Sequence, residues 1–257
     1  MNFPVRAHNY HICNNFPCLS YFFLHSSSCS MGRGIFIVLE GTDRIGKSTQ
    51  AKLLESTLTR LYGKETLLVR FPDRSTPLGQ SLSSYLNGKL ELNPHAVHLL
   101  FTANRWERAA EISQALESGR CVIADRYSYS GIVYTAAKEP NPPSWEWCNR
   151  TEECLPQPDL IICLLPVHLA DLAKRGGFGD ERFENADFQS RVIQNFRRLA
   201  EEINAEALRA PEDEKKPRWE WVIASKMTPE QVHDAICEIL ETKLPHCPQL
   251  RKQPPSQ

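Results

Sequence analysis

The sequence predicts an α/β fold in which a five-stranded parallel β-sheet carries helices on both faces. Short apolar runs alternate with longer stretches of helical periodicity along the 257 residues, and this alternation is typical of a parallel sheet with crossover helices. Hydrophobic residues make up 41% and charged residues 24% of the chain. This is the composition of a globular protein and excludes a wholly disordered, collagenous or coiled-coil one.

Five apolar segments are expected to form the strands. The first, Ile35–Leu39, is continuously apolar and contains β-branched residues, as strands covered on both faces usually do. Pro72 stops the second segment, and Asp159 and Pro166 bound the fourth. The segments after the first are Thr66–Phe71, Cys121–Asp125, Leu160–Leu165 and Trp219–Ala224.

Helices are expected between these strands. Lys47–Tyr62 has apolar residues at helical spacing, and Gly63 follows as a stop signal. A long helical pattern within Pro94–Ser118 ends at Gly119. The proline-rich stretch at Asn141 and the charged segment Pro211–Lys216 have the composition of surface loops. The other expected helices begin near Ser130, begin at Phe188, and span Thr228–Leu244.

The two ends of the chain differ from the patterned part. Residues 1–30 contain no Asp or Glu and hold three of the nine cysteines. They are open to three interpretations: a secretory signal, a mitochondrial transit peptide, or a disordered or artefactual extension before a working start at Met31. We expect residues 1–31 to be an extension, 32–244 the folded domain, and 245–257, with four prolines, a disordered tail. The expected compartments are the cytoplasm and also the nucleus. The alternative is the mitochondrion, if residues 1–30 are a transit peptide.

Charge and hydropathy argue against two classes of partner. Thirty basic and 31 acidic residues leave a net charge of −1, so no global electrostatic attraction to nucleic acid is expected. The longest apolar stretches, such as Leu160–Val167, are far short of the ~20 residues that span a bilayer. No CxxC pair occurs, so we expect reduced thiols, with Cys121 and Cys163 in the core.

A phosphate-binding motif lies between the first strand and the first helix. Gly41–Thr49 reads GTDRIGKST and fits the pattern G-x-x-x-x-G-K-[ST]. Glycines let successive amides wrap around a phosphate, Lys47 reaches the β- and γ-phosphates, and the Ser48 hydroxyl is a ligand for Mg²⁺. The motif in this context predicts a fold of the P-loop NTPase type that binds a nucleotide.

Two charged residues inside this motif suggest phosphoryl transfer to a second ligand. Asp43 would repel a triphosphate unless its carboxylate faces another molecule. Arg44 adds a cation where charge develops during phosphoryl transfer. The alternative for both is a pair of solvated loop charges.

Further charged residues follow two more of the expected strands. Arg74 comes after the second strand, and Asp125 and Arg126 end the third. The carboxyl ends of parallel strands face the ligand crevice, so the arginines can hold a phosphate and Asp125 can hold Mg²⁺ or its water shell. Ser130 and Gly131 permit close approach of a ligand at the next helix. Surface arginines and a plain salt bridge are the alternatives.

Phe101 and Arg105 are four residues apart on an expected helix and therefore share a face. A flat ring beside a guanidinium suits a planar base. The ring can stack on the base, and the guanidinium can donate hydrogen bonds to its edge. A core phenylalanine beside a surface arginine is the usual explanation for this spacing and stays the alternative.

Lys174–Phe183 reads KRGGFGDERF, which is rich in glycine and charge. This composition suits a short lid that excludes water over a bound nucleotide. A flexible connection between two helices is the alternative.

Taken together, these segments resemble the thymidylate kinase (dTMP kinase) family of eukaryotes. The resemblance covers roughly Gly34–Ala224, with the motifs in the family's order. The P-loop motif is specific by itself, and the others are specific as an ordered set. The matching motifs are GTDRIGKST, FPDRST, LLFTANRW, DRYSYSG and KRGGFGDERFE with FQ soon after.

The resemblance implies the reaction ATP + dTMP → ADP + dTDP with Mg²⁺, a step towards dTTP for DNA replication, and a homodimer. Lys47, Arg44, Arg74 and Asp125 match the catalytic set, and Ser48 and Asp125 match the metal site. The lid would bring Arg175 or Arg182 near the phosphates. The ATP-binding residues implied are Gly41, Thr42, Asp43, Arg44, Ile45, Gly46, Lys47, Ser48, Thr49, Arg175 and Arg182.

For dTMP, the resemblance implies that Asp43 bonds the sugar 3′-hydroxyl and that Arg74 and Arg126 hold the phosphate. Phe101 would stack on thymine, and Arg105 would bond an exocyclic oxygen of the base. The dTMP-binding residues implied are Asp43, Phe71, Arg74, Phe101, Arg105, Arg126, Ser130, Gly131, Tyr134, Phe183 and Gln189.

The chain departs from the family's pattern at a few positions. Phe183 stands where the family often has Tyr, and Tyr134 stands where Phe is common. The Asn141–Glu153 segment looks longer than a minimal member of the family needs. The rival enzyme is a deoxynucleoside kinase, which shares the P-loop and the lid but has an acceptor without phosphate. A P-loop switch protein is disfavoured because no Asn-Lys-x-Asp motif occurs. A non-catalytic nucleotide-binding module is disfavoured by intact Lys47, Ser48 and Asp125.

Overall fold

The computed structural model describes residues 33–170, 179, 181–211 and 216–244. Its strands are β1 (Phe36–Gly41), β2 (Leu67–Arg70), β3 (Val122–Asp125), β4 (Leu160–Leu165) and β5 (Arg218–Ile223). Its helices are α1 (Lys47–Tyr62), α2 (Pro77–Leu86), α3 (Pro94–Glu117), α4 (Ser128–Ala136), α5 (Trp145–Thr151), α7 (Ala186–Arg209) and α8 (Pro229–Lys243).

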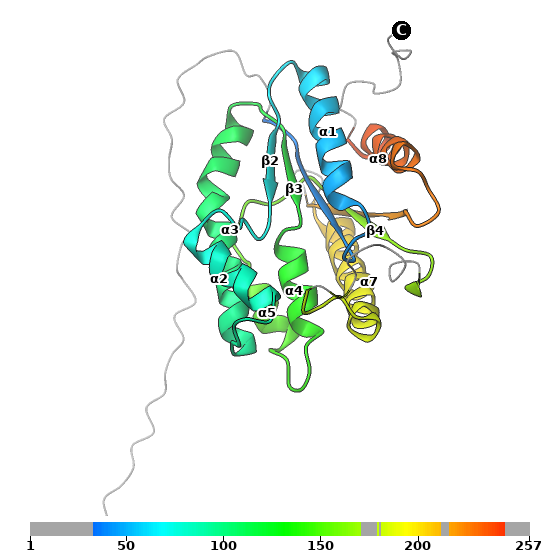
Figure 1. The fold of residues 1–257 in the computed structure, drawn as a ribbon. Coiled ribbons are helices and arrows are strands. Elements are labelled where there is room, and N and C mark those ends of the chain that lie inside the picture. Colours follow the sequence, from blue (N-terminus) through cyan, green and yellow to red (C-terminus); the bar gives the residue numbers. More distant parts are fainter. Residues whose placement is uncertain (1–32, 171–178, 180, 212–215, 245–257) are drawn as a thin grey trace, which may run out of the picture. The chain divides into compact units, whose positions relative to one another are not determined.

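The five strands form one parallel sheet, as predicted, and their order in it is β2-β3-β1-β4-β5. The central strand is β1, which lies between β3 and β4 (Figure 1). Leu39 of β1 pairs with Asp125 of β3, and Arg70 of β2 pairs with the same residue. The carboxyl ends of these three strands therefore lie at one edge of the sheet, where the P-loop begins.

Helices cover both faces of the sheet, and the side chains of β1 divide between them. Successive side chains of a strand point to opposite faces. Phe36 and Val38 belong to a buried cluster with residues of α2, α3, α4, α5 and α7. Ile37 and Leu39 belong to a second cluster with residues of α1 and α8. This division explains why β1 is apolar at successive positions.

Local sequence sets several helix ends. Gly63 ends α1 with φ 63°, and its N–H donates to the carbonyl of Thr59 at 3.0 Å. Glycine adopts this left-handed conformation without a steric penalty. At the start of α8, Thr228 and Gln231 form a capping box in which each side chain bonds the other's backbone.

The predicted elements are largely confirmed, with shifts at some ends. The helix Lys47–Tyr62 and the strand Leu160–Leu165 are as predicted. The first strand begins one residue later and runs on to Gly41, because its pairing with β4 continues to Leu164. No helix was predicted in the segment after Asn141, yet α5 lies there, with its N-terminus capped by Ser144 and Cys148 in the core.

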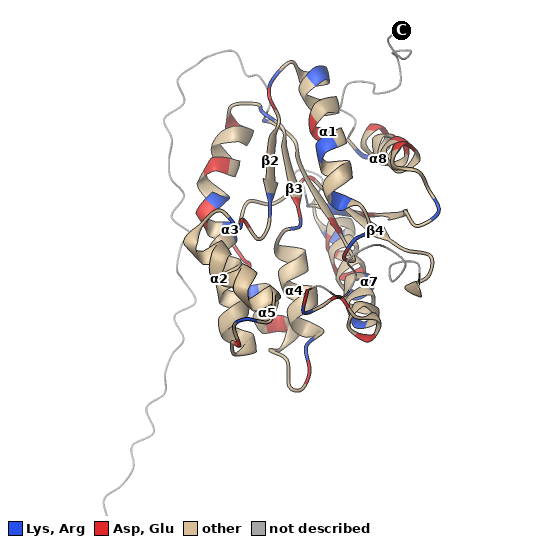
Figure 2. Ribbon diagram, viewed as in Figure 1, with Lys and Arg blue, Asp and Glu red and all other residues tan. Residues whose placement is uncertain are grey.

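Other expectations meet the structure in part. Cys121 and Cys163 are buried, and the described cysteines are free thiols. Within the described ranges, no helix is both long and apolar enough to cross a membrane. Basic and acidic residues are interspersed over the helices (Figure 2). The expectations for residues 1–31, 245–257 and most of the Pro211–Lys216 loop lie outside the described residues.

Candidate active site

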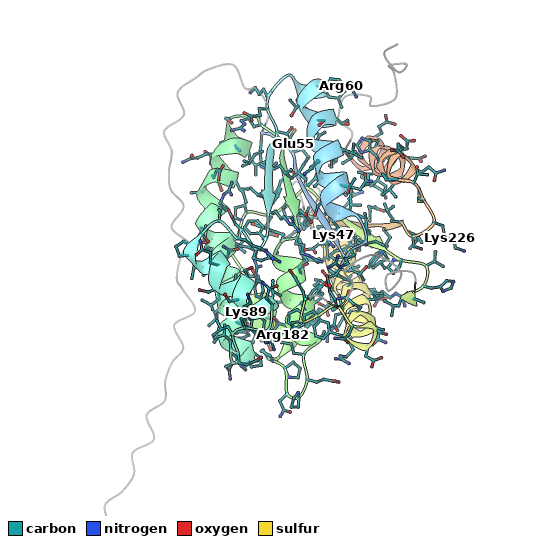
Figure 3. The ribbon with its side chains drawn as sticks, in the orientation of Figure 1. Lys47, Glu55, Arg60, Lys89, Arg182 and Lys226 are labelled. Atoms are coloured by element: carbon teal, nitrogen blue, oxygen red, sulfur yellow. The ribbon has the colours of Figure 1, made fainter. Side chains whose placement is uncertain are left out.

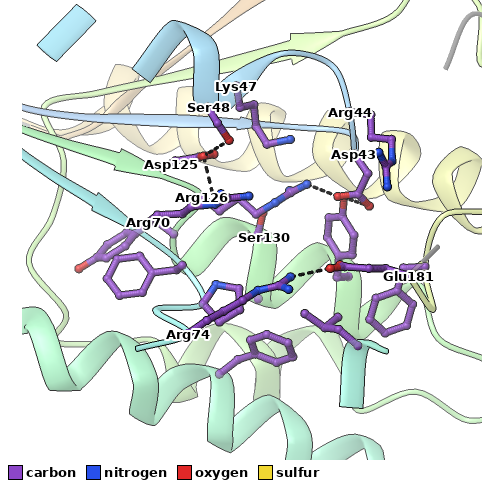
Figure 4. Close-up of a pocket in the computed structure, with 18 of the residues that line it drawn as sticks. Asp43, Arg44, Lys47, Ser48, Arg70, Arg74, Asp125, Arg126, Ser130 and Glu181 are labelled. Carbon is purple, nitrogen blue, oxygen red and sulfur yellow. Dashed lines mark hydrogen bonds and ion pairs between the residues drawn. The ribbon is translucent and has the colours of Figure 1, made fainter. Parts of the chain in front are cut away.

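A cavity of ≈ 620 Å³ lies at the carboxyl ends of β1, β2 and β3. This volume falls within the range of small-molecule sites. Its walls come from the P-loop, the segment after β2, helices α3 and α4, and the residues that precede α7 (Figure 4). The cavity therefore brings together segments that are distant in the sequence.

The P-loop places a buried lysine at the start of α1. Lys47 is 6% exposed, and its Nζ donates to the carbonyl of Thr42 at 2.6 Å. Burial, and then the nearby charge of Arg126, lowers the pKa of Lys47 to about 8. Gly41 has φ 135°, and a Cβ there would lie 2.1 Å from the carbonyl oxygen of Leu164. Only glycine fits this turn, so the motif's first glycine has a steric reason.

Ser48 and Asp125 meet beside the P-loop. The Ser48 hydroxyl donates to Asp125 Oδ2 at 2.5 Å, and Arg70 Nε lies 3.5 Å from the same oxygen (Figure 4). Two oxygen ligands on adjacent elements suit Mg²⁺, which keeps several waters and uses few protein ligands. Among the described residues, no group of three His, Cys, Asp or Glu side chains could hold a metal. Ser48 and Asp125 are the residues that would hold a metal ion bound together with a nucleotide.

Asp43 of the P-loop faces away from Ser48 and towards α4 and α7. Its carboxylate accepts hydrogen bonds from Arg126, from the Tyr134 hydroxyl at 3.0 Å and from Gln189 Nε2 at 2.8 Å. Burial raises the pKa of Asp43, but the charges of Arg126 and Lys47 and these hydrogen bonds outweigh it, so the pKa lies below its ordinary value. Asp43 is therefore an ionised group held by α4, α7 and Arg126, and not a solvated loop charge.

A buried carboxylate that sequence reasoning missed organises the segment after β3. Glu40 is fully buried, and accepts from the backbone N–H groups of Tyr127 and Ser130 at 2.9 and 3.0 Å and from the Ser130 hydroxyl at 2.5 Å. Burial raises the pKa of Glu40 against the opposing charge of Arg126. These bonds fix the start of α4. The sequence signal that could have identified Glu40 is its position at the end of β1, directly before Gly41 of the P-loop motif.

Arg126 adopts an uncommon backbone conformation, with φ 70°. Non-glycine residues with positive φ are uncommon and cluster at functional sites. Its Nη1 donates to the carbonyl of Gly41 at 2.9 Å and to the Ser130 hydroxyl at 3.0 Å. The strand-end arginine is thereby held against both the P-loop and α4.

Two acidic residues that precede α7 pair with arginines predicted for the site. Arg74 Nη2 donates to Glu181 at 2.6 Å (Figure 4), and Arg44 Nε donates to Glu184 at 2.8 Å. Glu184 also accepts from the N–H of Gly179 at 2.9 Å. Both arginines therefore have donor groups that are bonded to carboxylates of the protein itself.

The predicted base-binding pair lies in the wall of the cavity. Phe101 and Arg105 both line it. Arg105 is 2% exposed and forms a bidentate ion pair with Glu152, a residue just after α5. Arg105 is therefore not the surface arginine of the alternative interpretation. Glu152 was not predicted, because no local pattern links it to α3.

Not every predicted residue lies at the cavity. Arg182 bonds Glu91 at 2.5 Å and lies over the ring of Tyr85, 4.4 Å from its centroid. It is not among the lining residues, and Figure 3 shows it well apart from Lys47. In this structure residues of α2 and of the following loop bind Arg182, and its place near the phosphates stays a prediction. Arg175 lies outside the described residues, and Ile45 packs in the core with α1.

Most of the other predicted residues lie in or next to the wall of the cavity. Phe183 lines the cavity and stacks on Phe188, with centroids 4.6 Å apart. Gln189 is buried and also donates to the carbonyl of Phe183 at 2.9 Å. The remaining predicted residues in the lining are Gly46, Thr49, Phe71, Ser130, Gly131 and Tyr134.

Comparison with known proteins shows the family to which the chain belongs. The family model described as thymidylate kinase matches residues 39–235. The chain belongs to the thymidylate kinase family. Membership makes it a nucleoside monophosphate kinase that uses ATP as phosphoryl donor.

Thymidylate kinases from several eukaryotes resemble the chain. The Homo sapiens enzyme is 44% identical over 204 residues, covering 79% of this chain and 88% of that protein. The Danio rerio enzyme is 40% identical over 212 residues, covering 82% and 92%. The solved thymidylate kinase of Candida albicans has a TM-score of 0.67 at 36% identity, covering 82% of this chain and 92% of that chain. The thymidylate kinase of Ehrlichia chaffeensis, with a TM-score of 0.60 at 22% identity, shares the fold.

Proposed function

We propose that this thymidylate kinase family member transfers the γ-phosphoryl group of ATP to dTMP, giving dTDP and ADP. The position of Asp43 carries the proposal. It belongs to the ATP-binding loop, yet its carboxylate bonds Arg126, Tyr134 and Gln189. A carboxylate in that place can accept a hydrogen bond from a sugar hydroxyl, and so binds an acceptor nucleoside beside the triphosphate.

The acceptor phosphate is assigned to Arg74 and Arg126. Both line the cavity beside the P-loop, and a guanidinium matches a phosphate with two parallel hydrogen bonds. Phe101 offers a face for stacking and Arg105 donors for a base carbonyl. Two arginines at the acceptor position favour a nucleoside monophosphate over a nucleoside.

Lys47 and the P-loop amides are assigned to the ATP phosphates, and Ser48 with Asp125 to Mg²⁺. A bound Mg²⁺ neutralises charge on the phosphates. The chain's own contribution is to position the two nucleotides and to direct cations at the transferred group, since phosphoryl transfer needs little covalent chemistry from the protein. Arg44, released from Glu184, is the cation placed for that charge.

A coupled ADP-release assay with Mg-ATP tests the proposal. Wild-type protein is given dTMP, dUMP, dCMP, dGMP and thymidine in parallel. Turnover with dTMP well above the others is expected. Turnover with thymidine but not dTMP would indicate a deoxynucleoside kinase and would remove the roles of Arg74 and Arg126. No turnover from folded, ATP-binding protein would indicate a non-catalytic module.

The proposed assembly is a homodimer formed by helix packing. Leu99 and Trp106 support it, since they are 47% and 46% exposed and lie seven residues apart on one face of α3. Light scattering of wild type and Trp106→Glu tests it, and a monomeric wild type would refute it.

The proposed compartments are the cytoplasm and the nucleus. The alternative is the mitochondrion, if residues 1–30 act as a transit peptide. Fluorescent fusions with and without residues 1–30 distinguish these locations.

A further inference from the structure

Glu40 is a fully buried carboxylate near the end of β1, and its two oxygens have different partners. Oε1 accepts from the backbone N–H groups of Tyr127 and Ser130, at 2.9 and 3.0 Å. Oε2 accepts from the Ser130 hydroxyl at 2.5 Å. The side chain of Tyr127 does not cap α4, so Oε1 supplies the cap that a helix start needs. Capping explains Oε1, but it does not explain Oε2.

The contact with Oε2 determines which way the Ser130 hydroxyl points. Three donors and the nearby charge of Arg126 favour the ionised form of Glu40. An ionised carboxylate only accepts hydrogen bonds, so the hydroxyl proton of Ser130 is directed at Glu40.

The oxygen of Ser130 has one position left for a ligand. A hydroxyl oxygen has two lone pairs, and Arg126 Nη1 donates to one of them at 3.0 Å. Ser130 also lines the cavity. Because its proton is used by Glu40, Ser130 can accept a hydrogen bond from a ligand in the cavity but cannot donate one.

The first turn of α4 lies against Arg105, the arginine assigned to the base. A Cβ at Gly131 would come within 2.6 Å of Arg105 Nη2, and Gly131 is the neighbour of Ser130 in the chain. Ser130 is also bonded to Arg126, which is assigned to the phosphate. The Ser130 oxygen is therefore close to both of the arginines assigned to the acceptor.

The chemistry of dTMP limits what this oxygen can bind. Ionised phosphate oxygens are acceptors and cannot pair with a lone pair of Ser130. The donors of dTMP are the 3′-hydroxyl of the sugar and the imino N3–H of thymine. Asp43 is assigned to the sugar hydroxyl, which leaves the imino group of the base.

We propose that Glu40 is a positioning residue for base selection, which orients the Ser130 hydroxyl so that its oxygen accepts from the imino N3–H of the acceptor's base. Thymine and uracil present this donor. Cytosine presents an unprotonated N3, so two lone pairs would face each other without a hydrogen bond. This inference rests on the proposed function, because it takes a thymidylate as the acceptor.

Two competing explanations leave Glu40 without a role in base selection. In the first, Glu40 only caps α4, and the direction of the Ser130 hydroxyl has no effect on the acceptor. In the second, Glu40 is protonated and donates to Ser130, whose own proton already points into the cavity.

Glu40→Gln separates these explanations, because an amide has one accepting end and one donating end. The backbone N–H groups of Tyr127 and Ser130 hold its Oε1, so the cap is kept. Its Nε2 then donates to the Ser130 oxygen, and Arg126 uses the other lone pair. The hydroxyl proton is left for the cavity, so Ser130 changes from an acceptor to a donor.

The experiment measures kcat/KM of wild type and Glu40→Gln with three acceptors: dTMP and the 5′-monophosphates of 5-methyl-2′-deoxycytidine and 5-methyl-2′-deoxyisocytidine. Both analogues present N3 as an acceptor. Each keeps one of the two thymine carbonyls, so one of them keeps the carbonyl that Arg105 binds. We expect the preference for dTMP over at least one analogue to fall about tenfold or more in Glu40→Gln. Glu117→Gln, an exposed carboxylate at the end of α3, is the matched control with an unchanged preference.

A smaller fall for both analogues would overturn the inference. An equal loss with all three acceptors would leave Glu40 as a cap alone, and unchanged kinetics would show that Ser130 already donates. If Glu40→Gln does not fold, Ser130→Ala, which removes the hydroxyl and keeps the cap, replaces it under the same criterion.

Calorimetric binding of the three acceptors separates this inference from the proposed function. Wild-type protein that binds dTMP without turnover refutes the reaction alone. The ratios of Kd values in wild type and Glu40→Gln then decide the role of Glu40 by the same comparison.

Discussion

Arg105 and Glu152 form an ion pair in which both side chains are nearly inaccessible to solvent, at 2% and 3% exposed. Nε and Nη2 of the arginine donate to the two carboxylate oxygens. These bonds use one edge of the guanidinium and do not involve Nη1. Thr102 donates to the same carboxylate at 2.9 Å. The segment after α5 thus sets the orientation of an arginine on α3.

Replacing Glu152 should harm both stability and acceptor binding. Glu152→Gln leaves a buried guanidinium without its counter-charge, which costs about 3–5 kcal/mol of unfolding free energy for buried pairs. We expect KM for dTMP to rise about tenfold, because Arg105 loses its orientation, while KM for ATP changes little. Denaturant titration and steady-state kinetics measure these effects. The exposed neighbour Glu153→Gln is the control, and equal behaviour of the two variants would contradict the assignment.

Removing the charge of Glu181 should strengthen acceptor binding. This carboxylate holds Arg74 at 2.6 Å, so the acceptor phosphate has to displace it. The pair is partly exposed and contributes at most about 1 kcal/mol. Glu181→Gln should therefore lower KM for dTMP by about two- to fivefold. The control Glu91→Gln, which releases Arg182 instead, should leave KM for dTMP unchanged. A rise in KM for dTMP in Glu181→Gln would show that the carboxylate of Glu181 assists acceptor binding.

Arg44→Ala should affect turnover more than binding. Arg44 lies in the P-loop, and its backbone has φ 58°, an uncommon conformation for a residue other than glycine. If it stabilises charge on the transferred group, kcat falls about 100-fold while KM for dTMP stays within about twofold. Arg60→Ala, near the far end of α1 (Figure 3), serves as control. Unchanged kcat with raised KM would refute the role.

ATP binding should be accompanied by proton uptake above neutral pH. In the ligand-free protein the pKa of Lys47 is lowered to about 8, so a growing fraction of the side chain is neutral as pH rises through 8. Phosphate charges favour the protonated form and raise that pKa. At pH 8 about half a proton per site should be taken up, and almost none at pH 6.5.

Calorimetry of ATP binding in buffers of different ionisation enthalpy measures this uptake. Lys47→Arg is the control, because its guanidinium stays charged throughout the range. Uptake of the same size in that variant would assign the proton to another group.

The sequence predicts best those features that depend on neighbouring residues. The P-loop could be predicted as a unit because its strand, turn and helix are contiguous, from Phe36 to Tyr62. The strand-end positions of Arg74 and Asp125 followed from parallel topology. The five-stranded sheet followed from alternation alone.

Contacts between distant segments could not be predicted in this way. Glu152 reaches Arg105 across 47 positions, and Arg182 pairs with Glu91 across 91. The family resemblance implied that a closing lid brings Arg175 or Arg182 near the phosphates, and it said nothing of the contacts that Arg182 makes in this structure. In the fold, the carbonyls of Tyr85 and Leu90 and the ring of Tyr85 bind the guanidinium elsewhere. Which partner a charged side chain contacts depends on the packing of distant segments, and the hydrophobic periodicity of the sequence does not determine that packing.

The three arginines of the proposed phosphate sites, Arg44, Arg74 and Arg126, each carry a carboxylate partner in the protein itself. The local charge at their guanidinium groups is therefore nearly balanced before any nucleotide arrives. A balanced site projects a weak field into solvent, so it attracts nucleotides little from a distance. Association should then depend weakly on ionic strength, and free phosphate or sulfate should be poor competitors, because an isolated anion exchanges one ion pair for another without the contacts of a sugar and a base.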